Sequence, residues 1–317
     1  MKIEEVHEKG KRILNEAGKA IVGKEEVLKL ILTTILADGH ILIEDLPGLA
    51  KTLMAKSFAT ALGVKFRRVQ FTPDLLPSDI LGVSVFNQKT LEFEFRKGPI
   101  FTNILLADEI NRAPPKTQSA LLEAMQERQV TIEGKTYYLE RPFIVIATQN
   151  PIEQEGTYPL PEAQLDRFLV RLRVGYPTKQ EEIEILKRRI ERKKEEVDIN
   201  PIVTPEDVVK MQRAVEDVYV SDAILEYITD IVKATRESKR EIDIGASPRG
   251  SLALLKLSRA YAALEGRDYV IPDDVKKVAV PALSHRLILK RELWYTRVSQ
   301  ESVMERILEK VPVPKFE

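Results

Sequence analysis

The 317-residue chain has no cysteine, only three histidines, no net charge and no long apolar run. The missing cysteines exclude disulfides, and so few histidines argue against a zinc cluster. There is no apolar signal core near the start and no run of about 20 apolar residues, so a cytoplasmic protein without a transmembrane segment is expected. Lysine plus arginine equals aspartate plus glutamate at 49 each. This balance counts against a nucleic-acid binder, in which a basic excess is typical.

The remaining composition is typical of a globular protein. Apolar residues make up 44% and charged residues 31% of the chain, which is too apolar for a disordered polypeptide. A length of 317 residues predicts roughly two domains.

The spacing of apolar residues predicts an α/β arrangement in the first half. Helical periodicity covers 3–20, 24–38 and 51–62, and the period changes between these segments. Short apolar or alternating runs predict five strands, several of them separated by helical segments. The predicted strands cover 41–43, 65–71, 104–107, 143–147 and 169–174. Such an order favours a largely parallel five-stranded sheet that is covered on both faces.

Two further segments read as β-hairpins that interrupt the α/β pattern. Residues 83–86 can pair with the alternating segment 91–96 across 87–90. Residues 130–132 can pair with 137–139 across 133–135. Both hairpins are expected to be insertions.

After Tyr176-Pro177 the chain changes character. Residues 178–197 form a charge-dense segment with an apolar stripe of Ile183, Leu186, Ile190 and Val197. Its basic groups could indicate nucleic acid, but glutamates are interleaved with them, which favours a solvated helix face. The remainder reads as helices without a convincing strand. We therefore expect a nucleotide-binding α/β core over 1–176 and an all-helical lid domain over 177–317.

The turn after the first strand could hold phosphate. In the segment 44–52, Lys51 and Thr52 stand where a strand has turned into a helix, as a P-loop requires. The strict G-x-x-x-x-G-K-[ST] pattern fails, because Asp45 and Ala50 occupy its two glycine positions. Aspartate tolerates left-handed backbone better than most residues, and alanine is tolerable at 50 if the backbone there is already helical. An ordinary strand–turn–helix with a surface lysine is the alternative.

A second polar pair follows another predicted strand. Asp108 could hold the Mg²⁺ shell, and Glu109 could orient and deprotonate an attacking water. A solvated turn is the alternative, against which the placement on another parallel strand argues. Asn150, at the end of a third strand, could hold the lytic water or the γ-phosphate.

Two arginines are further candidates. Ser247 and Pro248 are a suitable N-cap and first helical residue, which leaves Arg249 in the first turn, where its charge opposes the helix dipole at a cost of about 0.3–1 kcal/mol. That placement suggests an anion partner, and a neighbouring carboxylate is the alternative. Arg167, just before the last strand, could be an arginine finger that reaches a neighbouring subunit's nucleotide, or it could form a structural salt bridge. Arg171 and Arg173 are less attractive for that role.

In this order, the segments resemble the MoxR family of AAA+ ATPases over nearly the whole chain. The matching segments are IVGKEE at 21–26, EDLPGLAKT at 44–52, RRVQFTPDLLPSDILG at 67–82, FEFRKGPIFTNILLADEINRAPPKTQSALLEAMQE at 93–127, ATQNP at 147–151, EAQLDRFLVRLRVGYP at 162–177 and GASPRG at 245–250. The substituted glycines are themselves usual in that family.

The resemblance implies a P-loop AAA+ core with two hairpin insertions, a helical lid and a ring, expected to be a hexamer. It assigns Lys51 and Thr52 to Walker A, Asp108 and Glu109 to Walker B, Asn150 to the first sensor, Arg249 to the second and Arg167 to the arginine finger. The implied metal ligands are Thr52 and Asp108. The implied nucleotide-binding residues are Ile21, Val22, Gly23, Pro47, Gly48, Leu49, Ala50, Lys51, Thr52 and Leu53.

The hairpins at 82–96 and 130–139 match the helix-2 and pre-sensor-1 insertions of a larger AAA+ clade, which includes magnesium chelatases and minichromosome maintenance helicases. The resemblance also implies a chaperone-like remodelling ATPase that uses ATP and Mg²⁺ and acts on a protein client, in assembly, activation or metal or cofactor insertion. Relatives commonly work with a von Willebrand factor A domain; its D-x-S-x-S signature is absent here, so that partner would be a separate protein. A nucleic-acid translocase and a slow, nucleotide-switched scaffold are the alternatives, and no stable nucleic-acid partner is expected.

Overall fold

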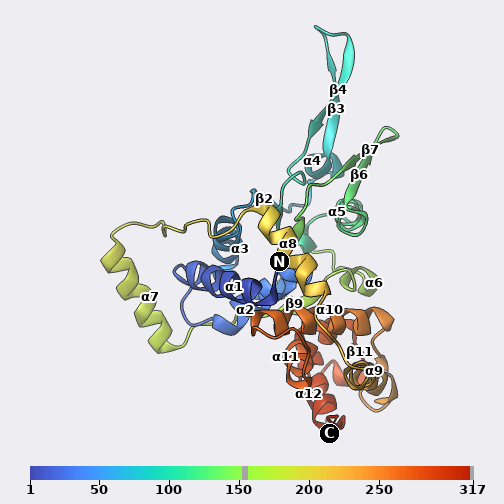
Figure 1. The fold of residues 1–317 in the computed structure, drawn as a ribbon. Coiled ribbons are helices and arrows are strands. Elements are labelled where there is room, and N and C mark those ends of the chain that lie inside the picture. The colour runs from blue at the N-terminus through green and yellow to red at the C-terminus, as the bar shows by residue number, and fades with distance from the viewer. Residues whose placement is uncertain (152–155, 315–317) are drawn as a thin grey trace.

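The computed structural model describes residues 1–151 and 156–314, and its centre is a sheet of five parallel strands (Figure 1). The strand order is β2-β5-β8-β1-β9. Their bounds are β1 (Ile41–Glu44), β2 (Phe66–Gln70), β5 (Ile104–Asp108), β8 (Ile144–Gln149) and β9 (Val170–Leu172). The predicted five-stranded parallel sheet is confirmed.

Helices occupy most of the remaining chain. They are α1 (Ile3–Gly18), α2 (Glu25–Leu36), α3 (Lys51–Ala61), α4 (Pro77–Leu81), α5 (Pro115–Glu127), α6 (Glu162–Leu165), α7 (Lys179–Arg192), α8 (Pro205–Glu216), α9 (Asp222–Glu237), α10 (Pro248–Leu264), α11 (Pro272–Leu283) and α12 (Gln300–Lys310). Short 3₁₀ turns lie at η1 (Ile110–Arg112), η2 (Ser284–Arg286) and η3 (Arg291–Leu293). Ser247 caps α10 as predicted, because its hydroxyl accepts the Arg249 N–H at 3.2 Å.

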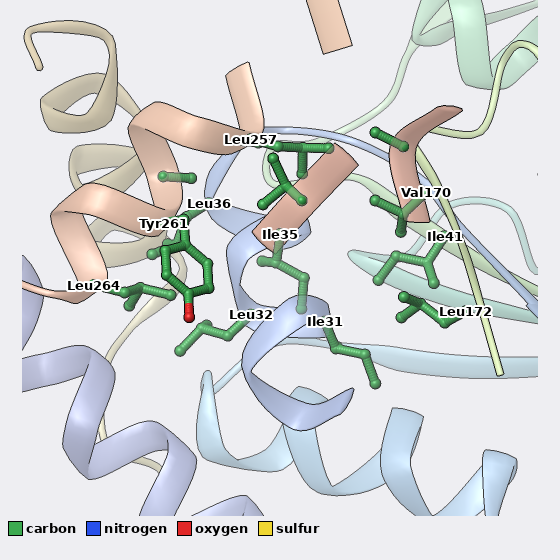
Figure 2. Close-up of a cluster of buried hydrophobic side chains, with 14 of the residues drawn as sticks. Ile31, Leu32, Ile35, Leu36, Ile41, Val170, Leu172, Leu257, Tyr261 and Leu264 are labelled. Carbon is green, nitrogen blue, oxygen red and sulfur yellow. The ribbon is translucent and has the colours of Figure 1, made fainter. Parts of the chain in front are cut away.

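Alternating side chains along the strands separate two apolar cores. Ile41 and Ile43 of β1 face one core, and Leu42 between them faces the other. The larger core is built by α1, α2, α3 and α8 to α12, whereas α4 and α5 cover the opposite face. Figure 2 shows the larger core where α2 lies between the sheet and α10, with Ile35 beside Leu257. This core continues across residues 176 and 177, so the expected division into two domains there stays a prediction.

Both predicted hairpins are present and stand out from the body at the top of Figure 1. The first consists of β3 (Gly82–Asn87) and β4 (Glu92–Lys97), and the second of β6 (Gln129–Ile132) and β7 (Lys135–Tyr138). The second turn is shorter than predicted, since Lys135 pairs with Ile132. The turn consists of Glu133 and Gly134 alone, with φ of 49° and 77°. Positive φ at both positions is what a two-residue hairpin turn requires.

The second half differs from the prediction in two respects. It is not entirely helical, because β10 (Ile242–Ile244) pairs antiparallel with β11 (Ile288–Leu289). Helix α7 ends at Arg192, where Lys193 adopts a left-handed φ of 60°, so Val197 is not part of its apolar stripe. Among the described residues, no helix is both long and apolar enough to cross a membrane.

His40, just before β1, ties the amino end of the sheet to α5. Its Nδ1 accepts the Val145 N–H at 2.9 Å, and its Nε2 donates to the Met125 carbonyl at 3.1 Å. These two bonds occupy both ring nitrogens of neutral His40, one as the acceptor and the other as the donor. Burial, reinforced by the nearby charge of Arg128, lowers the pKa of His40 to about 3.

This histidine should make stability depend on pH. Between an unfolded pKa of about 6.5 and the folded value of about 3, only the unfolded chain binds the proton, so stability falls as the pH drops through this window, by about 1.4 kcal/mol per pH unit. We expect His40→Gln to reduce the slope of unfolding free energy against pH by about that amount. It should also cost about 1–3 kcal/mol at pH 7.5, because the Val145 N–H loses its acceptor. Urea unfolding at several pH values between 5 and 7.5 measures both, and an unchanged slope would contradict the assignment.

Candidate active site

A cavity of about 410 Å³ lies at the edge of the sheet where the strands end. Lys51 and Thr52 reach it from the start of α3, Asp108 and Glu109 from the end of β5, and Asn150 from the end of β8. Its other described lining residues are Pro47, Gly48, Leu49, Ala50, Leu53, Arg68 and Gln70. The structure therefore brings together five site residues that the sequence predicted on three separate segments.

The loop 45–50 is shaped for phosphate. Gly48 and Ala50 both adopt left-handed backbone, with φ of 81° and 57°. Helix α3 begins directly after Ala50 without a side-chain cap, so the N–H groups of its first turn are available to an anion. The expectation that Ala50 sits in right-handed helical backbone is wrong: the turn needs positive φ at this position, and alanine adopts it.

Asp45 has a different role from the one its position suggested. It is not among the residues with positive φ. Its carboxylate accepts the N–H groups of Leu46, Val174 and Gly175 at 2.8, 2.6 and 2.7 Å. The side chain thus fastens the phosphate loop to the chain that leaves β9, a link that a glycine could not make.

Lys51 is held at the floor of the cavity. Its ammonium group donates to the Asp45 carbonyl at 2.8 Å. Partial burial lowers the pKa of Lys51, while the charges of Asp45, Asp108 and Glu109 oppose that change. The ammonium group and the Asp108 and Glu109 carboxylates line one cavity, where a phosphate group with its cation would contact both charge types.

Asp108 is bonded on both carboxylate oxygens. Oδ1 accepts the Thr148 hydroxyl at 2.6 Å, and Oδ2 accepts Nε and Nη2 of Arg68 at 3.0 and 2.6 Å. Glu109 adopts left-handed backbone with φ 56°, and its N–H donates to the same Thr148 hydroxyl at 2.9 Å. Thr148 thus fixes both acidic residues relative to β8.

The Glu109 carboxylate is also in contact with two polar side chains. Its Oε2 accepts Gln70 Nε2 at 2.8 Å and Arg112 Nη1 at 3.1 Å. Sequence reasoning missed the contributions of Arg68, Gln70, Arg112 and Thr148. Arg68 and Gln70 could have been found only by knowing that β2 neighbours β5, because their spacing along the chain carries no signal.

Arg167 and Arg249 lie elsewhere. They line a separate cavity of about 270 Å³ together with His40 and Leu169, which precede β1 and β9. Because the strands are parallel, this is the opposite edge of the sheet, about 13 Å away along the four residues of β1. Arg249, which the resemblance assigns to the second sensor, therefore does not lie beside the Lys51 cavity of its own chain.

The second cavity is rich in positive charge. Arg249 lies 3.5 Å from Asp166, so the predicted carboxylate neighbour is present. Asp166 also pairs with the buried Arg286, and burial lowers the pKa of Arg286 to about 10. Arg249 keeps 56% of its side chain exposed, and Lys256 lines the same cavity. A single carboxylate among these cations leaves the surface suited to an anion.

Ile21, Val22 and Gly23 line a third cavity, of about 750 Å³, between the α1–α2 connection and α7. The side chain of Glu181 lies against Gly23. None of the three residues lines the Lys51 cavity. The link between the two places is indirect: Lys24 donates to the Tyr176 carbonyl at 3.1 Å, one residue after the Asp45 contact.

The donors around Lys51 fit a nucleotide with a divalent cation. Mg²⁺ prefers oxygen ligands and usually shares them with phosphates, and the cavity offers the Asp108 carboxylate and the Thr52 hydroxyl. Within the part of the chain that the structure describes, no group of three or more acidic, histidine or cysteine side chains could hold a metal ion. A cation here would therefore depend on the phosphates for part of its shell.

Comparison with known proteins also supports the assignment of the Lys51 cavity to a nucleotide. Residues 40–170 match the model of the ATPase family associated with various cellular activities (AAA), and residues 234–307 match the AAA lid domain. The chain is 44% identical to "Chaperone MoxR1" of Mycobacterium tuberculosis, with 96% of this chain and 82% of that protein covered.

Two further relatives cover the whole chain. "Uncharacterized protein YeaC" of Bacillus subtilis is 49% identical, over 98% of this chain and 97% of its own. The crystal structure of a proposed ATPase from Cytophaga hutchinsonii superposes with a TM-score of 0.91 at 44% identity, covering 98% of this chain and 96% of that one. The arrangement described above is therefore that of a solved relative.

The left-handed conformation of Ala50 can be tested directly. We expect Ala50→Gly to leave stability unchanged or to raise it by up to about 1 kcal/mol, because glycine adopts positive φ without a steric cost. In right-handed helical backbone the same change would cost about 0.5–1 kcal/mol. Urea denaturation measures the difference, with Ala55→Gly in the buried middle of α3 as a destabilised control. A loss in Ala50→Gly as large as in the control would show that the loop conformation is wrong.

Proposed function

The chain belongs to the MoxR family of AAA ATPases, and we propose that it hydrolyses ATP with Mg²⁺ in a homo-oligomeric ring to remodel a protein client. The observation that carries this proposal is the convergence of Lys51, Asp108, Glu109 and Asn150 on one cavity at the strand ends. The proposed division of labour places this cavity in a nucleotide core over 1–176 and the moving helices in a lid over 177–317.

The residues of the cavity fit distinct roles. The first-turn N–H groups of α3 and the Lys51 ammonium group would bind the β- and γ-phosphates. Thr52 and Asp108 would hold Mg²⁺, which supplies positive charge against the phosphate oxygens. Glu109 would accept the proton of the attacking water, and Asn150 would orient that water or the γ-phosphate.

Three contacts must change for these roles to be exercised. Arg68 has to turn away from Asp108 Oδ2 before that oxygen can face a cation. Gln70 and Arg112 both hold Glu109 Oε2, and a carboxylate that accepts two hydrogen bonds is a weaker base than a free one. We propose that binding of the nucleotide rearranges these contacts and thereby starts hydrolysis.

Arg167 and Arg249 would act on the nucleotide of a neighbouring subunit. Both lie at the sheet edge opposite Lys51, so one chain cannot bring them to its own phosphates. A head-to-tail ring, which we propose to be a hexamer, places this edge of one subunit over the Lys51 edge of the next. The arginines would then stabilise the charge of the transition state.

The two hairpins are the parts best placed to act on a client. Each is rooted at a contact of Glu109: Gln70 ends β2, which leads through α4 to β3, and Arg112 leads through α5 to β6. Phe95 of the first hairpin stacks on Tyr137 of the second, with ring centroids 4.2 Å apart. A change at Glu109 would therefore move both hairpins together.

The nature of the client follows from the hairpin surface and from a relative. Exposed Phe86 and Phe93 pair on one face of the first hairpin, and large exposed apolar groups commonly mark protein contacts. The Mycobacterium tuberculosis relative is named a chaperone. We propose a protein client, with a separate von Willebrand factor A domain protein as the partner that selects it.

Mixing two inactive variants tests the composite site. We expect Lys51→Ala and Arg167→Ala each to lose ATPase activity, by about 10³-fold or more for the arginine if it stabilises the transition state. A 1:1 mixture should regain up to roughly a quarter of wild-type activity, because one interface in four joins an intact Lys51 to an intact Arg167. Steady-state phosphate release measures this recovery. Two variants of the same residue, Arg167→Ala mixed with Arg167→Glu, are the control that should stay inactive, and a dead first mixture would refute action across the interface.

Glu109→Gln tests hydrolysis and client binding together. The variant should bind ATP with wild-type affinity, lose ATPase activity by at least about 10²-fold, and hold its client. Capture from a lysate with ATP, followed by mass spectrometry, should give a protein that Lys51→Ala does not retain. If DNA instead stimulates wild-type ATPase activity in a salt-dependent way, the protein-client assignment would be wrong.

A further inference from the structure

Helix α7 is an amphipathic helix whose apolar side faces away from its own chain. In Figure 1 it stands apart from the rest of the molecule, and none of its 14 residues is buried. Ile183, Leu186 and Ile190 are 42%, 60% and 73% exposed. An apolar stripe normally packs on the protein interior, whereas the stripe of α7 is not packed on the interior of its own chain.

The polar side of α7 takes the inward position instead. Gln180, Glu181, Glu184 and Arg188 line the cavity toward α1 and α2, and Arg188 donates to the Gly18 carbonyl at 3.4 Å. At about 100° per residue, the direction of this group and that of the apolar stripe differ by about 140°. The helix is thus anchored to its own chain through polar groups and presents its apolar stripe to something else.

Nucleic acid is a poor candidate for that occupant, because three basic residues of this arm, Arg188, Arg189 and Lys194, are already paired with carboxylates. Arg188 bonds Glu184 at 2.9 Å, Arg189 bonds Glu195 at 2.9 Å, and Lys194 bonds Asp198 at 2.6 Å. These pairs favour the predicted solvated face over the nucleic-acid alternative. The part of α7 that lacks a partner among the described residues of this chain is its aliphatic stripe, Ile183, Leu186 and Ile190.

The place where α7 is attached indicates the occupant. The chain that leads into α7 is bonded to Asp45 of the phosphate loop through Val174 and Gly175. In the proposed ring, the surface that approaches this edge is the one that carries Arg167 and Arg249 of the next subunit. That surface has an exposed apolar group of its own: Leu252, one turn after Arg249 on α10, is 59% exposed.

Leu252 also lines the cavity of about 270 Å³ beside the two arginines, together with Met125, Leu169 and Ala253. In the proposed ring, the exposed stripe of α7 and the exposed Leu252 therefore lie on opposite sides of one interface. We propose that the stripe Ile183, Leu186 and Ile190 docks on this Leu252 surface of a second copy of the chain. Because α7 is joined to the phosphate loop, the docked helix would link the nucleotide of one subunit to the arginines of the next. This step rests on the proposed function.

Cysteine cross-linking tests the contact without background, since the chain has no cysteine of its own. We expect Leu186→Cys combined with Leu252→Cys to give a ladder of covalent oligomers on oxidation with a nonhydrolysable ATP analogue and Mg²⁺. The matched control is Ile185→Cys with Leu252→Cys. Ile185 is 43% exposed on the same helix but points about 130° away from the stripe, so its yield should be at least tenfold lower.

The outcomes separate this inference from the proposed function. A ring seen by mass photometry without the Leu186–Leu252 cross-link, or with equal yields from both pairs, would overturn the docking alone. A wild-type chain that stays monomeric with the analogue would overturn both the docking and the ring.

A second pair of variants measures the contribution of the stripe. Leu186→Asp should raise the concentration needed for assembly at least tenfold, and Ile185→Asp should leave it unchanged. Circular dichroism checks that both fold, as expected for exposed positions. If Leu186→Asp assembles normally but no longer captures a client in the Glu109→Gln background, the occupant is the client, and the second-copy assignment is wrong.

Discussion

Parallel pairing of β2, β5, β8 and β1 is the constraint on which the rest of this molecule depends. The pairing aligns Asp108 beside Gln70 and Glu44 beside Gln149, so segments far apart in the chain end at one edge. The strands end in polar side chains at that edge, whereas the middles of β1, β5 and β8 are buried on both faces. The phosphate loop leads into α3 at the same edge, so the loop, the helix and these strand ends together form the cavity.

Residues at this edge also contact the segments that lead to the two hairpins. Thr148 holds Asp108 and the Glu109 backbone, while Gln70 and Arg112 hold the Glu109 carboxylate. Gln70 is followed by α4 and the first hairpin, and Arg112 by α5 and the second hairpin. The two hairpins contact each other through Phe95 and Tyr137. In the proposed mechanism, a change at the Glu109 carboxylate would reach the projecting hairpins through these continuous chain segments rather than through a long chain of side-chain contacts.

The opposite edge is the reason for proposing that one chain alone does not form a complete site. Arg167 precedes β9, and Arg249 of α10 lines the same cavity. Lys51 follows β1, so the sheet itself separates the two arginines from the lysine. Closing a ring is the simplest arrangement that unites them, and the outward stripe of α7 is what such an interface would need to bury. Asp45 joins these features, since its carboxylate holds the phosphate loop to the chain that becomes α7.

The sequence by itself determined the local pieces. Apolar period predicted the five sheet strands, the helices near 3–20, 24–38 and 51–62, and both hairpins, because burial of one face imposes a period on each element. It also singled out Lys51, Asp108, Glu109 and Asn150, since each is a polar residue at the end of a buried strand or the start of a helix. Only the tertiary structure decided which pieces meet. Strand order brought Arg68 and Gln70 to the carboxylates, the direction of the sheet separated Arg249 from Lys51, and the packing of α7 turned its predicted apolar stripe outward. Those outcomes depend on long-range packing, which leaves no period in the chain.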